Sequence, residues 1–490
     1  MLSLITRSLR AAVRSAPAQV STQHRRLQHS GEVQPAQRTL LSLRPSQFVE
    51  FLRSRKIQRC FAIWNGESVV TSHPEIQELA DWMNMGRERQ FRRHEALFMQ
   101  LGLRTGCLLT AFLWRTDRGQ AYGGIRLQPY NTLEQLLQDG LRQSTLLGVK
   151  AALAGIWLGG GKGIIPQPDD RQHVQPEFRQ ALFYDYGDFL SSLNGCYVAG
   201  LDIGVNSQDM ANVHMRTRWA VNVPGDMGGS GNAAPLIAKG VVCALEAALE
   251  HGQLGSLRGK SVCVQGAGSI GREIMLSLVD QGISQLHVTD VHQKRVDDAY
   301  DLLAGRLGSR LKVTRVPVGD VSILKEKCDI LVPCAIPHIL SPQTIPSLGA
   351  QVVCGPVNEQ RVSDDDCQLL QDHGVLYVPE YLFNRMAVVN SAYEWYGRLQ
   401  EDPELEKHFG NSWEHSIGVM VRRVLCQASE QGQSPVLVAD ALAEGLSRQL
   451  HPLWPGRARQ VISALVTHGW HRGHDFWRDR LHFVTTHGYA

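Results

Sequence analysis

Residues 260–271 read KSVCVQGAGSIG, and this stretch decides the fold of the second half of the chain. Its apolar first half predicts a strand, its glycines predict a tight turn, and the following residues, 270–280, predict a helix. In such a turn Gly266 permits the bend, Gly268 lets a pyrophosphate approach the backbone, and Gly271 lets the helix pack closely on the strand. The helix N-terminus adds partial positive charge. The stretch therefore predicts the first βαβ unit of a doubly wound, dinucleotide-binding sheet.

A second predicted strand, 285–290, ends in Asp290. A carboxylate at this position accepts hydrogen bonds from ribose hydroxyls and repels a 2′-phosphate, which favours NAD over NADP. His292, Lys294 and Arg295 follow, and their positive charge leaves NADP as the less favoured alternative. Further strands of the same sheet are predicted at 329–332, 351–354 and 375–378.

Upstream of this unit, residues 159–163 read GGGKG, with Lys162 in the run. Leucines at spacings of three to five predict a long helix over 132–154 that carries Lys150 in its final turns, and Lys162 is predicted on a glycine-rich loop. Two ammonium groups in one dry cleft repel each other and lose hydration, which lowers a lysine pKa towards neutrality. Taken singly, either lysine is more typical of a solvated surface.

Together these runs resemble the glutamate/leucine/phenylalanine/valine dehydrogenase superfamily, and its leucine dehydrogenase branch in particular. The matching runs keep the family order from about residue 40 to 450, and they are 123–126, Lys150, 158–162, 202–204, 229–232, 264–268, 288–290, 333–335, 358–360 and 384–390. The resemblance implies an α/β protein with an N-terminal α/β substrate and oligomerisation domain and a Rossmann-type NAD-binding domain, with the active-site cleft between them. The implied segments are 32–228, 229–385, and C-terminal helices at 386–450 that return to the substrate domain.

The resemblance also implies roles for individual residues. Lys162 would activate the amine and the attacking water, Asp202 would shuttle protons, and Lys150 would bind the α-carboxylate. Gly123 and Gly124 would let backbone carbonyls approach the substrate amine. The cofactor would lie against Gly266, Gly268, Ser269, Ile270, Gly271, Asp290, Ala335, Asn358 and Asn384. The implied reaction is the reversible NAD-linked oxidation of an L-amino acid to its 2-oxo acid and ammonia, carried out by a homo-oligomer.

Tyr122 is the residue that bears on substrate choice. Glutamate-specific members of the family place a lysine directly before the paired glycines, where it holds the side-chain carboxylate. This chain has Tyr122 there, and burying a carboxylate without a counter-charge is expensive. The sequence therefore favours a neutral substrate with a branched-chain or aromatic side chain, and a glutamate-specific enzyme remains the alternative.

Several positions depart from the family pattern on the nicotinamide side. Ile237 replaces a threonine, Ser341 replaces an asparagine, and Arg385 replaces a glycine. His338 falls in the same altered run, and Val205 replaces a threonine after Asp202. Each lost hydrogen bond to the carboxamide would cost about 1–2 kcal/mol. A non-catalytic, dehydrogenase-like protein that binds nucleotide or amino acid is therefore the second hypothesis, and the retained lysines and Asp202 argue against it.

Composition sets the remaining expectations. Residues 1–31 lack acidic side chains and carry five arginines, which predicts a mitochondrial transit peptide and a matrix protein; a merely disordered basic N-terminus is the alternative. The ten cysteines have no metal-site spacing, so no metal is expected, and Cys334 is expected to be a packing residue. Neither the net charge of +3 nor any apolar run indicates a nucleic-acid or membrane partner. The extra tail, 451–490, is expected to be solvated or to contact another subunit.

Overall fold

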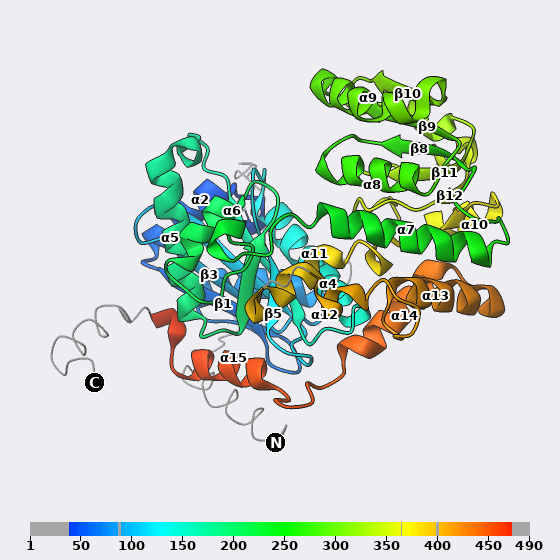
Figure 1. Ribbon diagram of the computed structural model, residues 1–490. Helices are drawn as coiled ribbons and strands as arrows, with labels where there is room; N and C mark the ends of the chain where they lie inside the picture. Colours follow the sequence, from blue (N-terminus) through cyan, green and yellow to red (C-terminus); the bar gives the residue numbers. More distant parts are fainter. Residues whose placement is uncertain (1–38, 87–89, 364, 398–400, 473–490) are drawn as a thin grey trace, which may run out of the picture. The chain divides into compact units, whose positions relative to one another are not determined.

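Figure 1 shows the computed structural model, which describes residues 39–86, 90–363, 365–397 and 401–472. The chain forms two compact units, both of the α/β class that the sequence predicts. The first unit takes in the chain up to Gly148, Leu158–Val223 and the chain from Leu450 on, and the second takes in Val149–Trp157 and Pro224–Gln449. The predicted transit peptide lies outside the described residues.

The first unit is built on a seven-stranded mixed sheet in the order β2-β1-β3-β4-β6-β5-β7. Its strands are β1 (Arg59–Trp64), β2 (Val69–Thr71), β3 (Ala96–Leu101), β4 (Leu108–Trp114), β5 (Ala121–Gln128), β6 (Gly159–Pro166) and β7 (Tyr197–Leu201). Its helices are α2 (Pro45–Ser54), α3 (Gln77–Asn84), α5 (Pro176–Ser192), α6 (Ser207–His214) and α15 (Arg457–Thr467). The predicted long helix is α4 (Leu133–Leu153), whose last turn belongs to the second unit.

The glycine run that carries Lys162 is a strand, which corrects the prediction of a loop. All eight residues of β6 are buried, and β6 pairs with β4 on one side and β5 on the other. A Cβ built on Gly160 would lie 2.1 Å from the Ser144 carbonyl of α4, and one on Gly163 would lie 2.0 Å from the Tyr186 hydroxyl. The glycines are therefore required by close packing on both faces of a central strand, and the strand gives Lys162 a rigid backbone.

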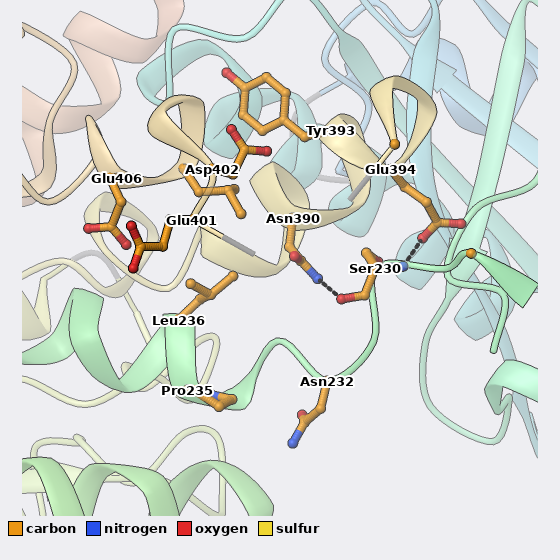
Figure 2. Close-up of a pocket in the computed structure, with 13 residues that line it drawn as sticks. Ser230, Asn232, Pro235, Leu236, Asn390, Tyr393, Glu394, Glu401, Asp402 and Glu406 are labelled. Atoms are coloured by element: carbon orange, nitrogen blue, oxygen red, sulfur yellow. Dashed lines mark hydrogen bonds between the residues drawn. The ribbon is translucent and has the colours of Figure 1, made fainter. Parts of the chain in front are cut away.

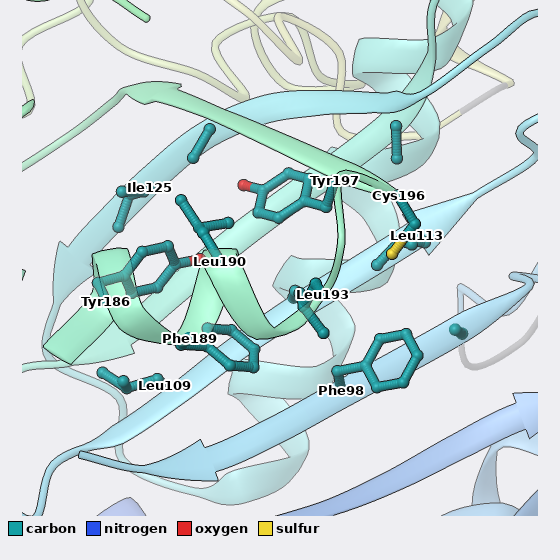
Figure 3. Close-up of a cluster of buried hydrophobic side chains, with 14 of the residues drawn as sticks. Phe98, Leu109, Leu113, Ile125, Tyr186, Phe189, Leu190, Leu193, Cys196 and Tyr197 are labelled. Atoms are coloured by element: carbon teal, nitrogen blue, oxygen red, sulfur yellow. The ribbon is translucent and has the colours of Figure 1, made fainter. Parts of the chain in front are cut away.

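The apolar core of the first unit lies on both faces of the sheet. Figure 3 shows one face, where α5 places side chains such as Phe189 and Leu190 against Leu109 and Leu113 of β4. Pro176 stands at the first turn of α5, where its missing N–H costs no hydrogen bond. This packing holds the ends of β5, β6 and β7 in fixed register.

Part of the segment after Leu450 belongs to this core, so the expectation of a solvated tail is wrong for α15 and Trp470. The alternative of a contact with another subunit stays a prediction. Trp470 is 8% exposed, its ring lies edge-on to Phe98 with centroids 5.0 Å apart, and its Nε1 donates to Ser192 Oγ at 3.1 Å. Arg459 of α15 donates to Glu95 at 2.8 Å and to Asp117 at 2.7 Å. The remainder of the predicted tail, 473–490, lies outside the described residues.

Replacing Trp470 with alanine is expected to destabilise the first unit by about 3–5 kcal/mol, because a large buried ring leaves a cavity. Urea denaturation, followed by the fluorescence of the remaining tryptophans, measures the loss. Trp454→Ala is the matched control, since Trp454 is 61% exposed in the same segment and its loss should change stability by about 0.5 kcal/mol or less. Equal effects of the two substitutions would contradict the packing described for Trp470.

The second unit is built on a six-stranded parallel sheet in the order β10-β9-β8-β11-β12-β13, which is the doubly wound arrangement. Its strands are β8 (Ser261–Gln265), β9 (Gln285–Asp290), β10 (Leu311–Arg315), β11 (Cys328–Pro333), β12 (Ala350–Val353) and β13 (Leu376–Tyr377). Its helices are α7 (Ala234–His251), α8 (Ser269–Asp280), α9 (Gln293–Leu307), α10 (Asp366–Asp372), α11 (Met386–Tyr393), α12 (Pro403–Glu406), α13 (Ile417–Gln431) and α14 (Pro435–Ser447). The predicted βαβ unit is confirmed as β8-α8-β9.

The helices α11 to α14 group with this second unit, and their predicted return to the substrate domain stays a prediction. The reason for the grouping is their packing: α13 and α11 both lie against α7, and Phe383 and Met386 contact the position that a Cβ on Gly240 of α7 would take. The turn between α13 and α14 is set by Gly432 with φ +61° and by Ser434, whose hydroxyl accepts from Leu437 N. No helix in the described ranges is long and apolar enough to cross a membrane.

Candidate active site

In the first unit three adjacent strands bring the predicted catalytic residues together. Lys162 is on β6, Arg126 is on β5, and Asp202 follows the last residue of β7. The ammonium of Lys162 donates to Asp202 Oδ2, and Arg126 Nε donates to the same oxygen at 2.8 Å. Lys162 is 2% exposed, and the side chain of Asp202 is 25% exposed. The site is therefore a buried ion pair with one carboxylate face accessible from outside.

The electrostatics of this pair favour proton transfer. Burial is the main cause that lowers the pKa of Lys162; the positive charge of Arg126 lowers it further, and the charge of Asp202 partly counteracts both. Burial alone would raise the pKa of Asp202, but Lys162 and Arg126 outweigh it and hold that pKa at about 2. A lysine whose pKa is lowered towards the working pH can exchange a proton, while the carboxylate stays charged beside it.

Arg126 and Asp139 are site residues that the sequence analysis did not assign. Arg126 is 8% exposed, and its Nη1 donates to both carboxylate oxygens of Asp139, at 2.9 and 3.1 Å. Tyr130 and Arg142 also donate to Asp139, at 2.7 and 3.1 Å. Arg126 is thus fixed between two carboxylates and donates to the same oxygen of Asp202 as Lys162. The sequence signal that could have identified Arg126 as a site residue is its position as a charged side chain within the otherwise apolar strand pattern of 121–127.

The paired glycines before Ile125 are required by close packing between strands. A Cβ on Gly123 would lie 1.7 Å from the Gly161 carbonyl, and one on Gly124 would lie 2.4 Å from the Leu201 carbonyl. The Gly123 carbonyl, predicted to approach the substrate amine, accepts from the Tyr197 hydroxyl at 2.8 Å. Tyr122 precedes them on β5 and is 5% exposed. The glycines therefore let β5 lie closely between the neighbouring strands that carry Lys162 and Asp202.

The glycine turn of the second unit has the geometry expected of a nucleotide-binding loop. Gly266 has φ +100°, and Gly268 is the N-cap of α8, which begins with Ser269 and Ile270. A Cβ on Gly271 would lie 2.1 Å from the Gly266 carbonyl, so helix and strand pack as closely as predicted. By contrast, a Cβ on Gly268 meets nothing nearer than Arg295 Nη1, at 4.0 Å. The backbone at Gly268 is thus open to a phosphate group.

Gln265, which directly precedes this loop, and Asn384, another predicted cofactor residue, have buried polar atoms without a partner among the described residues. Both side-chain amide atoms of Gln265 and the Oδ1 of Asn384 are in this condition. Unpaired buried polar atoms cost free energy unless a ligand or water completes them. Ala335, also predicted at the cofactor, lies against Gly266, where its Cβ is 2.7 Å from a Cβ built on that glycine. The residues present therefore fit a dinucleotide at this loop.

Asp290 ends β9 as predicted and is 6% exposed. Its Oδ2 accepts from Ala267 N and its Oδ1 accepts from His292 N, both at 2.8 Å. Arg295 Nη1 lies 3.8 Å from Oδ2 with half of its side chain exposed. The carboxylate is thus fixed by the glycine turn, with one cation close to it.

Lys150, predicted to bind the substrate, lies in the second unit with two predicted cofactor residues. Its ammonium donates to Asn358 Oδ1 at 2.8 Å, and Asn384 Nδ2 donates to the same oxygen at 2.8 Å. Asn384 Nδ2 also donates to the Pro356 carbonyl at 2.9 Å. Lys150 is 6% exposed. The amide oxygen of Asn358 therefore links Lys150, in the last turn of α4, to Asn384, just before α11.

Two of the positions in the altered runs, Ser341 and His338, have local hydrogen-bond partners of their own. Ser341 N donates to Thr344 Oγ1 at 2.9 Å and closes a turn. His338 is in the left-handed region with φ +55°, and its Nδ1 lies 3.0 Å from the Arg361 carbonyl. Ile237 is buried in α7 and has no polar side-chain atom. Cys334 is a free thiol whose pKa is raised by burial, in keeping with a packing role.

A cavity of 880 Å³ in the second unit is a separate feature (Figure 2). Its lining includes Ser230, whose N donates to Glu394 at 2.9 Å, and Asn390, whose Nδ2 donates to the Ser230 carbonyl at 3.3 Å. Glu401 and Glu406 add carboxylates. None of the predicted catalytic, substrate-binding or cofactor-binding residues lines it, and its acidic lining disfavours an amino acid's carboxylate. In the described part of the chain, no cluster of three or more His, Cys, Asp or Glu side chains could hold a metal ion.

The doubly wound sheet with an open glycine turn and the buried Lys162–Asp202 pair define the class: a nucleotide-binding α/β protein that also carries a buried lysine–carboxylate pair suited to proton transfer. Comparison with known protein families identifies the family. The model described as the Glu/Leu/Phe/Val dehydrogenase dimerisation domain matches residues 109–219, and that of the glutamate/leucine/phenylalanine/valine dehydrogenases matches residues 228–451.

Individual relatives agree with the family models. The chain is 31% identical to leucine dehydrogenase of Geobacillus stearothermophilus over 335 residues, which cover 67% of this chain and 84% of that one. It is 35% identical to phenylalanine dehydrogenase of Lysinibacillus sphaericus over 288 residues, 58% of this chain and 72% of that one. The crystal structure of L-tryptophan dehydrogenase from Nostoc punctiforme matches with a TM-score of 0.59 and 28% identity, covering 74% of this chain and 97% of that one. This chain belongs to the glutamate/leucine/phenylalanine/valine dehydrogenase family, and is an oxidoreductase that acts on amino acids.

Proposed function

We propose that this protein catalyses the reversible, NAD-linked oxidative deamination of a neutral L-amino acid to its 2-oxo acid and ammonia. The observation that carries the proposal is the buried pair of Lys162 and Asp202, held by Arg126. In its neutral form Lys162 takes a proton from the substrate amine and then from the attacking water. Asp202 lies within hydrogen-bond reach of that ammonium and receives or returns the proton through its exposed face.

Lys150 is the proposed partner of the substrate α-carboxylate. The family resemblance places the carboxylate-binding lysine at this position, and Asn358 Oδ1 accepts from its ammonium at 2.8 Å. NAD, when bound, supplies the hydride acceptor, and Gly266, Gly268 and Gly271 with the N-terminus of α8 are the groups that would hold its pyrophosphate. The carboxylate of Asp290 beside the turn supports NAD over NADP, because it would repel a 2′-phosphate.

A branched-chain or aromatic substrate is the narrower part of the proposal. Tyr122 is buried at the position where the family resemblance places a lysine in glutamate-specific enzymes. A phenol can donate one hydrogen bond, but it cannot neutralise a buried carboxylate. The relatives named for leucine, phenylalanine and tryptophan support the same class of side chain.

Nicotinamide absorbance with the full chain tests the activity and its substrate together. We expect turnover of branched-chain or aromatic L-amino acids with NAD, and of their 2-oxo acids with ammonia and NADH, at rates well above those with glutamate. Turnover of glutamate alone would refute the inference from Tyr122. A protein that binds NADH but shows no turnover would favour the non-catalytic alternative. In that alternative the changes at Ile237, Ser341 and Arg385 prevent productive binding of the nicotinamide.

We also propose that the protein is a homo-oligomer in the mitochondrial matrix. The match to a dimerisation domain at residues 109–219 supports the oligomer, and light scattering of the purified protein tests it, with a monomer as the contrary result. The arginine-rich, acid-free composition of residues 1–31 supports the location. N-terminal sequencing of protein recovered from mitochondria should find the first 25–31 residues removed, and an intact N-terminus there would contradict a cleaved leader.

A further inference from the structure

Arg385 is a fully buried arginine that the catalytic chemistry does not use. It is the N-cap residue of α11, has 0% exposure, and forms no ion pair with a carboxylate of the described ranges. Its Nη1 donates to the Leu153 carbonyl and its Nη2 donates to the His415 carbonyl. Burial lowers the pKa of Arg385 to about 9. Burying a charged guanidinium without a carboxylate partner is costly, and the two backbone carbonyls are the groups that offset this cost.

The first contact closes the end of α4. Leu153 is the last residue of α4, and the final four carbonyls of a helix have no partner within the helix. A cation at this end also interacts favourably with the helix dipole. His415 Nδ1 lies 3.2 Å from the same carbonyl, so two side chains meet there. Lys150 lies one turn earlier, and its own carbonyl accepts from Ala154 N at 3.0 Å. Arg385 therefore fixes the turn of α4 that carries Lys150.

The ammonium of Lys150 is tied to the same segment from its other side. It donates to Asn358 Oδ1, which also accepts from Nδ2 of Asn384. Asn384 is the neighbour of Arg385 in the chain. The contacts form a closed ring that runs from Lys150 through Asn358 and Asn384 to Arg385, then to Leu153 and back along α4.

We propose that Arg385 is a positioning residue that holds Lys150 for the substrate α-carboxylate. This inference rests on the proposed function of Lys150. It also gives a reason for the departure from the family glycine at this position: the guanidinium is engaged by two backbone carbonyls at the end of α4 and before α13. In this chain the arginine thus holds the lysine that is proposed to bind the substrate.

The test compares Arg385→Met, Arg385→Lys, Lys150→Met and the double variant Arg385→Met/Lys150→Met. Arg422→Met is the control, because Arg422 lies on α13 with 33% of its side chain exposed. The readouts are KM for the preferred amino acid, the Kd of its 2-oxo acid with NADH present, the Kd of NADH alone, and the melting temperature.

We expect Arg385→Met to raise the substrate KM and the 2-oxo acid Kd about tenfold, as for the loss of one well-placed hydrogen bond to a charged group. NADH affinity should stay within about twofold, and Arg385→Lys should recover part of the loss. The double variant should be no weaker than Lys150→Met alone, since coupled residues are not additive. The control should match the wild type.

Three results would overturn the inference. One is a lower melting temperature of Arg385→Met and Arg385→Lys with unchanged KM and 2-oxo acid Kd, which would leave a packing role only. Another is full additivity in the double variant. The third is a wild type that binds no 2-oxo acid. If Arg385→Met does not fold, Arg385→Lys and Lys150→Met decide by the same readouts. A wild type without turnover would refute the proposed reaction, but the binding measurements would still decide the role of Arg385.

Discussion

Lys162→Ala is expected to lower kcat about 10²- to 10⁴-fold, the range typical for the loss of a positioned general base. The side chain of Lys162 is 2% exposed and its ammonium is bonded to Asp202, and no other lysine lies on the strands β5, β6 and β7 that build this part of the site. Alanine leaves Asp202 paired with Arg126 at 2.8 Å, so the carboxylate keeps one partner. The loss should therefore fall on the chemistry and not on the integrity of the sheet.

The loss of kcat is measured from the rate of NADH formation by absorbance. NADH binding and the melting temperature are measured on the same preparations. Lys312→Ala is the matched control, because Lys312 lies on a strand of the other unit with 60% of its side chain exposed. The control should keep wild-type kcat. A Lys162→Ala protein that turns over within a few-fold of wild type would show that another group takes the proton.

The nucleotide-binding half of the fold could be predicted from the sequence because its signals are local. A strand, three glycines and a helix follow one another within 260–280, and the predicted strand at 285–290 coincides with β9. The geometry of Gly266, Gly268 and Gly271 follows from the same short stretch. Local chain direction and hydrogen bonding decide such a unit, and both can be inferred from neighbouring residues.

The first half could be predicted only in part, because its signals depend on contacts distant in sequence. The run at 159–163 has the composition of a loop, and only the approach of Ser144 and Tyr186 shows why a buried strand needs glycine there. The packing of Trp470 on Phe98 joins residues that no local pattern connects. The order of the seven strands has the same origin.

The catalytic pair was expected from the family resemblance, but the groups that tune it were not. Arg126 contacts Asp139, which lies 13 residues later in the sequence, and Asp202, which lies 76 residues later. Neither contact has a sequence signature apart from an arginine in an apolar strand. The electrostatic role of Arg126 follows only when all three side chains are placed together.

Asp202→Asn is expected to lower kcat by a similar factor, about 10²- to 10⁴-fold, because an amide cannot receive the proton from Lys162. Asparagine keeps the size and one acceptor oxygen for Arg126, so folding and NADH binding should be retained. With the pKa of Asp202 at about 2, the wild-type carboxylate stays charged above about pH 4. The limb on which kcat/KM rises with pH should therefore report the loss of a proton from Lys162.

The sign of the shift in this limb separates Lys162 from other groups. Burial lowers the pKa of Lys162 and Asp202 opposes that, so Asp202→Asn should lower this pKa further and move the limb to lower pH. Arg126 lowers the pKa of Lys162, so Arg126→Met should raise it and move the limb to higher pH. Opposite shifts of the same limb require a titrating group that lies beside both side chains. A limb that stays in place in both variants would mean that Lys162 is not the group that must lose its proton.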